Sequence, residues 1–94
     1  MGSTYRVKAV SALDNEIKIP TQIARDTGIR TNHISKVLSE LKNEELVECI
    51  NEDAKKGRLY RLTSTGQEIA DEMKYALIIE YTTLFIEYTS LIIS

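Results

Sequence analysis

The side chains with the widest hydrogen-bonding capacity lie together in residues 31–36 (TNHISK). Asn32 and His33 can donate and accept hydrogen bonds, and Lys36, about one helical turn further on, carries a positive charge. If this stretch opens a helix, the free amides of its first turn would attract anions such as phosphate. The alternative is an ordinary solvated polar face.

A second cluster is basic and surrounds a glycine. Lys55, Lys56 and Arg58 flank Gly57, and the planar guanidinium of Arg58 suits bidentate binding of a phosphate. A charge run of this kind is usually a solvated loop. Its interpretation therefore depends on the elements that carry it.

The sequence contains no motif for catalysis or for metal binding. His33 and Cys49 are its only soft metal ligands, and no clustered cysteines accompany them. His33 and Ser35 are two residues apart, so on a helix they would diverge and could not act as a pair. No acid pair, glycine-rich phosphate loop or nucleophile motif is present. We expect no enzyme, no metal site and no cofactor.

Composition indicates one small globular unit with an uneven charge distribution. The 94 residues are 43% hydrophobic and 28% charged, and with one cysteine and no secretory signal we expect a cytoplasmic protein. The net charge is -2, but residues 1–66 hold eleven Lys/Arg against nine Asp/Glu, and residues 67–94 hold one against five. Because the acidity belongs to the C-terminal part, it does not exclude nucleic acid as a partner of the rest.

Apolar spacing predicts two short helices at the start of the chain. Residues 5–13 suit a first helix, and the alternation in residues 17–19 suits a very short strand before Pro20. Thr21 is the expected N-cap of a second helix. Gly28 can adopt the left-handed conformation that ends this helix, with Ile29 packed beneath the turn.

A third helix should begin near Thr31, whose hydroxyl would cap it. Ile34, Leu38 and Leu41 then form one apolar stripe at i, i+4 and i+7. Two strands should follow, residues 46–50 and residues 58–63, joined by the charged connection 51–57. The basic cluster would lie at the tip of this hairpin.

A long final helix is predicted by an internal repeat. Residues 77–83 (LIIEYTT), 84–90 (LFIEYTS) and 91–94 (LIIS) are near copies at a period of seven, which suits a helix and not a strand. Thr63 or Thr65 would cap this helix, and Thr65 with Glu68 fits a capping box. Helical from Thr65 onward, the element would be roughly 45 Å long and would project from so small a domain.

The projecting helix carries an apolar seam at the 4,3,4,3 spacing of a coiled coil, widened by a neighbouring row. A second copy of the chain is the simplest partner for this surface, and Glu80 and Glu87 argue against membrane insertion. The predicted dimer interface comprises Leu77, Ile78, Tyr81, Leu84, Phe85, Tyr88, Leu91 and Ile92.

The succession of elements and two stretches resemble a known family. IARDTGIRTNHISKVLSELKNEELV and GRLYRLTSTG look like archaeal winged helix-turn-helix transcriptional regulators related to the ArsR and MarR families. The resemblance covers about two thirds of the chain. It implies a mainly α fold with a small β-hairpin wing (α+β), with residues 1–66 as the DNA-binding domain and residues 67–94 as a C-terminal dimerisation helix.

The resemblance also implies a partner and a site. Helix 31–43 would enter the major groove of double-stranded DNA, and wing 51–58 would lie on the backbone or in the minor groove. Asn32 could pair with adenine, and Lys36 with guanine or phosphate. The expected DNA-binding residues are Thr21, Gln22, Arg30, Thr31, Asn32, His33, Lys36, Lys55, Lys56 and Arg58.

Three further expectations concern the same resemblance. ArsR relatives that sense metals use clustered cysteines, which this sequence lacks, so Cys49 is expected to be half-buried in a strand. The MarR resemblance implies an aromatic effector pocket at Tyr81 and Tyr88 as an alternative to simple packing, and no effector is predicted. The alternative function is a winged-helix interaction module that docks other proteins through its C-terminal heptad helix.

Overall fold

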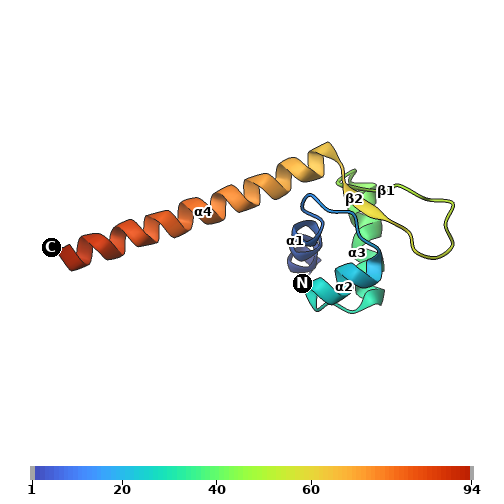
Figure 1. Cartoon of the computed structure of the whole chain (residues 1–94), viewed down its shortest axis with the longest axis horizontal. Helices are drawn as coiled ribbons and strands as arrows, with labels where there is room; N and C mark the ends of the chain where they lie inside the picture. The colour runs from blue at the N-terminus through green and yellow to red at the C-terminus, as the bar shows by residue number, and fades with distance from the viewer. Residues whose placement is uncertain (1, 94) are drawn as a thin grey trace.

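The computed structural model describes the backbone of residues 2–93 and the side chains of residues 4–80, 82–87 and 89–92. Three helices and a two-stranded hairpin pack together, and one long helix projects away from them (Figure 1). The predicted mainly α architecture with a small hairpin and a long C-terminal helix is confirmed. In chain order the elements are α1 (Gly2–Ala12), α2 (Pro20–Thr27), α3 (Thr31–Asn43), β1 (Val47–Cys49), β2 (Tyr60–Leu62) and α4 (Ser64–Ile93).

The core forms where α3 meets the other helices and the hairpin. The predicted stripe of α3 is buried, with Ile34, Leu38 and Leu41 each no more than 1% exposed, and Val37 extends it. Each large apolar side chain buried in this way contributes about 1.5–3 kcal/mol. The other buried residues around α3 are Ala9, Val10, Leu13, Ile23, Ile29, Val47, Leu62 and Ala70.

The glycine in the turn between α2 and α3 is as predicted, but the N-cap residues of the two helices are not. Gly28 has φ +73°, and its amide donates to the Ala24 carbonyl at 2.9 Å. The prediction that Thr21 caps α2 is wrong, because the helix begins at Pro20 and Ile19 occupies the cap position. The prediction that the Thr31 hydroxyl caps α3 is also wrong, because Thr31 is already its first helical residue and Arg30 occupies the cap position.

The hairpin is shorter than predicted. β1 and β2 are antiparallel strands of three residues, with Val47 opposite Leu62 and Cys49 opposite Tyr60. Neighbouring side chains of β2 lie on opposite faces, since Leu62 is buried and Arg61 is exposed. Residues 17–19 do not form a strand, and only an isolated bridge joins Lys18 to Tyr60.

The start of α4 is fixed to the hairpin by a threonine cap. The Thr63 hydroxyl accepts from the Gly66 amide at 3.1 Å and donates to the Glu45 carbonyl at 2.7 Å. The cap is therefore Thr63, and the predicted capping box of Thr65 with Glu68 is wrong.

The first turns of α4 pack on the rest of the domain. Ala70 is buried, and the Lys74 ammonium lies 2.8 Å from the Asp14 carboxylate in the turn after α1. Beyond this point the helix projects, which gives the molecule principal extents of 62 × 26 × 20 Å. No helix within the described residues is long and apolar enough to cross a membrane.

Candidate nucleic-acid interface

A groove of about 580 Å³ separates the start of α2 and one side of α3 from the tip of the hairpin. It brings together residues more than 30 positions apart in the sequence, because the hairpin folds back across α3. Its polar and charged lining consists of Thr21, Thr31, Ser35, Ser39, Lys55, Lys56, Arg58 and Tyr60. Five of these eight residues, namely Thr21, Thr31, Lys55, Lys56 and Arg58, belong to the predicted site.

The wall formed by α3 contains a row of hydroxyl residues, of which only Thr31 belongs to the predicted site. Thr31, Ser35 and Ser39 are four residues apart, so they lie along one side of the helix and all three are exposed. The regular spacing of these hydroxyl residues is visible in the sequence. The position of the hairpin tip opposite them could not be predicted from it.

The outward face of α3 lies next to this wall. Asn32 and Lys36 are exposed there and do not line the groove. Arg30 is exposed in the turn that precedes α3. These three predicted residues therefore extend the polar surface beyond the groove.

The opposite side of α3 faces α1. The His33 ring lies 5.7 Å from the Tyr5 ring, centroid to centroid, at an interplanar angle of 56°. Further along the same side, Glu44 forms an ion pair with Arg6 of α1. His33 thus lies on the side of α3 turned away from the hairpin tip, although its side chain is exposed.

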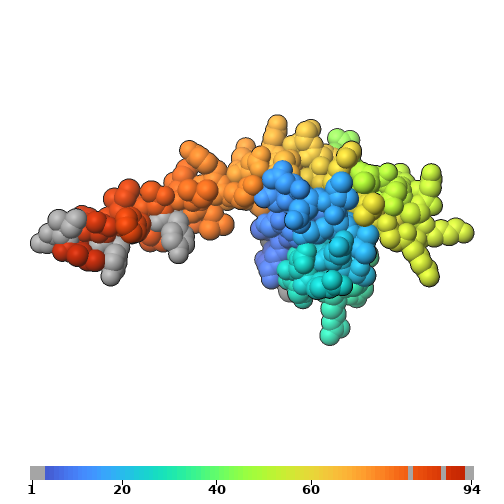
Figure 2. Space-filling model, in the orientation of Figure 1, coloured from blue at the N-terminus to red at the C-terminus, as the bar shows by residue number. Residues whose placement is uncertain are grey.

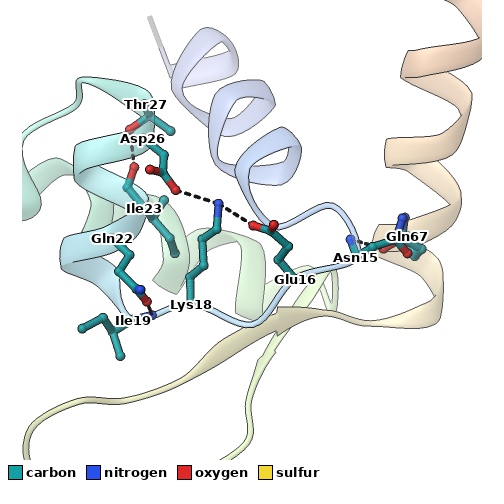
Figure 3. A network of polar contacts seen from close by, with 9 residues as sticks. All are labelled: Asn15, Glu16, Lys18, Ile19, Gln22, Ile23, Asp26, Thr27 and Gln67. Carbon is teal, nitrogen blue, oxygen red and sulfur yellow. Dashed lines mark hydrogen bonds and ion pairs between the residues drawn. The ribbon is translucent and has the colours of Figure 1, made fainter.

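Gln22 has a structural contact with the residue that precedes α2. Its Oε1 atom accepts from the amide of Ile19, the N-cap residue, at 3.1 Å (Figure 3). The Gln22 side chain is still exposed, but its carbonyl oxygen is already used.

The hairpin tip is held in shape by Asn51. Its Nδ2 donates to the Gly57 carbonyl at 3.1 Å, and its Oδ1 accepts from the Leu59 amide at 2.6 Å. Asparagine often closes loops in this way because its amide mimics a backbone peptide. In the sequence Asn51 is only one polar residue of the connection, whereas in the structure it joins the two sides of the tip.

Arg58 is also partly engaged within the tip. Its Nε donates to the Ala54 carbonyl at 3.0 Å, and the side chain remains exposed on the groove. This bond uses only one of the five guanidinium donors and orients the planar group. Gly57, with φ +69°, allows the backbone reversal that brings Arg58 back beside Lys55 and Lys56.

Ion pairs on the hairpin affect the charge of the tip. Glu52 pairs with Lys42 at the end of α3, and this hydrogen bond raises the pKa of Lys42 and lowers that of Glu52. Both groups are charged at neutral pH and offset one another. Because the charge of Lys42 offsets that of Glu52, the three basic residues of the tip dominate its local charge.

Lys18 fixes the position of the hairpin relative to α2 (Figure 3). Its ammonium lies 2.7 Å from the Asp26 carboxylate and 2.8 Å from the Glu16 carboxylate. Partial burial disfavours the charged form, but these two hydrogen bonds outweigh it and raise the pKa of Lys18. The Lys18 backbone also exchanges two hydrogen bonds with Tyr60, at 2.9 and 3.0 Å, so one residue joins α2 to β2.

The projecting part of α4 has an exposed apolar surface. Six members of the predicted interface are exposed, and the side chains of the other two, Tyr81 and Tyr88, lie outside the described residues. The exposed predicted residues are Leu77, Ile78, Leu84, Phe85, Leu91 and Ile92. Tyr75, Ile79 and Ile86 are also exposed and were not predicted.

Cys49 is half-buried in β1, as expected, and its sulfur lies 3.5 Å from Asn51 Oδ1. Among the side chains that the structure describes, no group of three His, Cys, Asp or Glu residues could hold a metal ion.

Solved structures of other proteins share this arrangement of helices and hairpin. Wild-type Lactococcus lactis ZitR, solved in complex with DNA, is 20% identical over 86% of this chain and 58% of its own, with a TM-score of 0.70. The chain has a winged-helix fold. The MarR family transcriptional regulator SPO1453 from Silicibacter pomeroyi is 20% identical over 89% of this chain and 59% of its own, with a TM-score of 0.68.

A third solved structure is similar over most of its own length. AF1382 from Archaeoglobus fulgidus is 17% identical over 82% of this chain and 88% of its own, with a TM-score of 0.73. The chain spans slightly less than three fifths of the ZitR and SPO1453 chains above. No protein-family model matches the sequence, and no curated protein sequence matches it.

Proposed function

We propose that this chain is a cytoplasmic transcriptional regulator that binds double-stranded DNA as a homodimer. The observation that carries the proposal is the groove in which the hydroxyl row of α3 faces the basic hairpin tip. A negatively charged backbone bound there would meet Lys55, Lys56 and Arg58 on one side and hydroxyl donors on the other. The DNA complex of ZitR, a protein of the same fold, supports this assignment.

The two parts of the interface have different tasks in this proposal. Helix 31–43 enters the major groove, where Asn32 pairs with adenine and Lys36 meets guanine or phosphate. The wing, residues 51–58, binds the backbone or the minor groove without reading the sequence. Phosphate contacts from outside the wing come from Arg30, Thr31 and Thr21, with His33 and Gln22 at the margin.

The exposed apolar surface of α4 supports the homodimer. Residues 67–94 would join two copies, and each copy would present residues 1–66 to the DNA. Two α3 helices related by a twofold axis would meet successive major grooves about 34 Å apart, so the site would be a pseudo-palindrome.

Selection of bound sequences from random duplex DNA, at a stated salt concentration, tests the proposal directly. We expect a pseudo-palindromic motif whose affinity falls steeply as salt increases, because phosphate contacts release counterions. Binding to all duplexes no tighter than about 10⁻⁴ M at low salt would contradict it, because ordinary non-specific binding is already that strong.

A second candidate function follows from the same apolar surface. The chain would be an interaction module whose C-terminal helix docks a helix of another protein, and the polar side of α3 would only be solvated. The large exposed side chains of α4 and its acidic character favour this candidate. Light scattering separates the two, because the module would be a monomer that captures a different helix, whereas the regulator would be a homo-oligomer.

A further inference from the structure

The projecting part of α4 is apolar on two nearly opposite sides. On the first side, Leu77 and Leu84 of the predicted seam are 63% and 61% exposed. Ile79 and Ile86, which are 49% and 61% exposed, lie elsewhere on the helix. Ile79 follows Leu77 by two residues, and at about 100° per residue this places it almost opposite Leu77.

The second side has the regular spacing of a packing surface. The second row, as we name it, consists of Tyr75, Ile79, Thr82, Ile86 and Thr89, whose intervals are 4, 3, 4 and 3 residues. This spacing keeps a row facing one neighbour along a supercoiled pair of helices. The predicted seam has the same intervals, and both rows repeat every seven residues.

The two threonines of the second row have their hydroxyl donors satisfied within the helix. Thr82 Oγ1 donates to the Ile78 carbonyl at 2.9 Å, and Thr89 Oγ1 donates to the Phe85 carbonyl at 2.8 Å. A hydroxyl bonded in this way can be buried without leaving an unsatisfied donor. From Ile79 to Thr89 the second row is therefore chemically suited to burial.

A two-helix pair joined along the predicted seam cannot cover both rows. If two α4 helices joined along Leu77 and Leu84, then Ile79 and Ile86 would occupy the position furthest from the partner. The area of a single row is also small. The eighteen residues from Tyr75 to Ile92 rise roughly 27 Å on a helix about 10 Å wide, and the resulting strip falls well below the roughly 800 Å² per partner of a standard stable interface.

We propose that the second row binds a further copy of this same helix, so that α4 joins four chains as a pair of dimers. An identical helix offers the matching seven-residue repeat on both rows. Two different twofold contacts on each chain close a complete assembly at four copies. Glu80, Thr83, Glu87 and Ser90 lie on the one remaining side of α4, which would face solvent.

The first contact of this assembly rests on the homodimer of the proposed function. The second contact needs no DNA and was not required by that function. One experiment on the full chain can therefore contradict the second contact without contradicting the homodimer.

Sedimentation equilibrium without DNA measures the assembly directly. We expect the wild-type chain to have the mass of four copies, and the double variant Ile79→Gln/Ile86→Gln to have half that mass. The matched control is Thr83→Gln/Ser90→Gln on the polar side of α4, which should keep four copies. Glutamine is a good helix former, and Ile79 and Ile86 are exposed in the single chain, so helicity measured by circular dichroism should be unchanged.

Any other mass of the wild-type chain, the double variant or the control overturns the inference. A wild-type mass of two copies would leave the homodimer intact and remove the second contact, whereas a mass of one copy would contradict the homodimer as well. A double variant that kept four copies would exclude the second row, and a control that also dissociated would show that the effect is not specific to it. Four copies that bound no DNA would contradict only the proposed function.

Discussion

Asn51 Oδ1 accepts a hydrogen bond at 2.6 Å from the amide of Leu59, eight residues further along the chain. This contact closes the hairpin tip and fixes the backbone beside the basic residues that line the groove. The shape of the wing therefore depends on a neutral side chain that contacts no ligand in the proposed complex.

The first prediction concerns this closure. Asn51→Ala removes two hydrogen bonds of about 1 kcal/mol each, so we expect the free energy of unfolding to fall by about 1–2 kcal/mol. Affinity for every duplex should fall as well, because Arg58 is no longer held in place. Urea denaturation and DNA titration measure the two effects, with Ser11→Ala, which is exposed on α1 and outside the wing, as the control. Unchanged stability would show that the tip does not depend on Asn51.

The second prediction separates sequence-independent binding of the DNA backbone from recognition of the base sequence. Lys56→Ala should weaken binding to all duplexes alike and lower the slope of log affinity against log salt by about one, because one phosphate contact is lost. Lys8→Ala on α1, which is exposed and does not line the groove, should leave the slope unchanged. Equal salt slopes for the Lys56 variant and the wild-type chain would show that the wing makes no phosphate contact through Lys56.

The third prediction compares two neighbours on α3. Asn32→Ala should relax preference at one base position, with a loss of discrimination of about 1–3 kcal/mol. His33→Ala should affect all sequences equally and mainly through stability, since His33 packs against Tyr5. Binding measured on a set of single-base variants of the selected site distinguishes them. A base-specific change for His33→Ala would place that ring on the DNA instead.

The fourth prediction concerns Gly66 at the start of α4. A Cβ atom there would overlap the Leu46 carbonyl oxygen and lie 3.3 Å from Leu62 Cδ2. Gly66→Ala should therefore destabilise the fold by about 2–3 kcal/mol, although alanine is intrinsically the better helix former by about 1 kcal/mol. Thr65→Ala, one residue earlier and exposed, is the control for thermal unfolding. A Gly66 variant as stable as the control would mean that α4 can move away from Leu46.

The fifth prediction concerns acid stability. Hydrogen bonds from Lys74 and then Gln67 lower the pKa of Asp14 below its ordinary value of 3.8. Because the folded pKa is lower than the unfolded one, the Asp14 contribution is fully present above pH 3.8 and is lost as the pH falls through the lowered pKa. Asp14→Asn should thus be less stable than wild type at neutral pH, and the difference should shrink in acid. Glu72→Gln, which removes an exposed carboxylate of α4, should show no comparable change.

Local patterns predicted the helices well because the information lies within a few residues. Ile34, Leu38 and Leu41 identify the buried side of α3, and Gly28 marks the turn that no other residue makes as easily. The errors at the helix starts are small shifts of the boundary. α2 already includes Thr21, and α3 already includes Thr31, so neither residue is at the cap position.

The groove and the hairpin contacts could not be predicted in the same way. The basic residues of the tip were identified by charge, but their position opposite Ser35 and Ser39 depends on how the hairpin folds across α3. Lys18, which fixes that position, reads in the sequence as an ordinary solvated lysine. Ile79 and Ile86 were not predicted for a different reason, since they repeat every seven residues just as Leu77 and Leu84 do but lie on another side of the helix.

Thr63 connects the hairpin to α4 and determines how rigidly α4 is attached to the rest of the domain. One residue separates β2 from α4, and it is held by its own cap and by the bond from its amide to the Leu46 carbonyl at 3.0 Å. No flexible linker allows α4 to swivel against the hairpin. In any assembly built on α4, the angle and separation of the DNA-binding surfaces would be set by rigid geometry. Inserting one extra helical residue before Tyr75 would rotate each surface by about 100° about the α4 axis. The surfaces would then point in the wrong direction to contact one DNA site together, although their separation would hardly change.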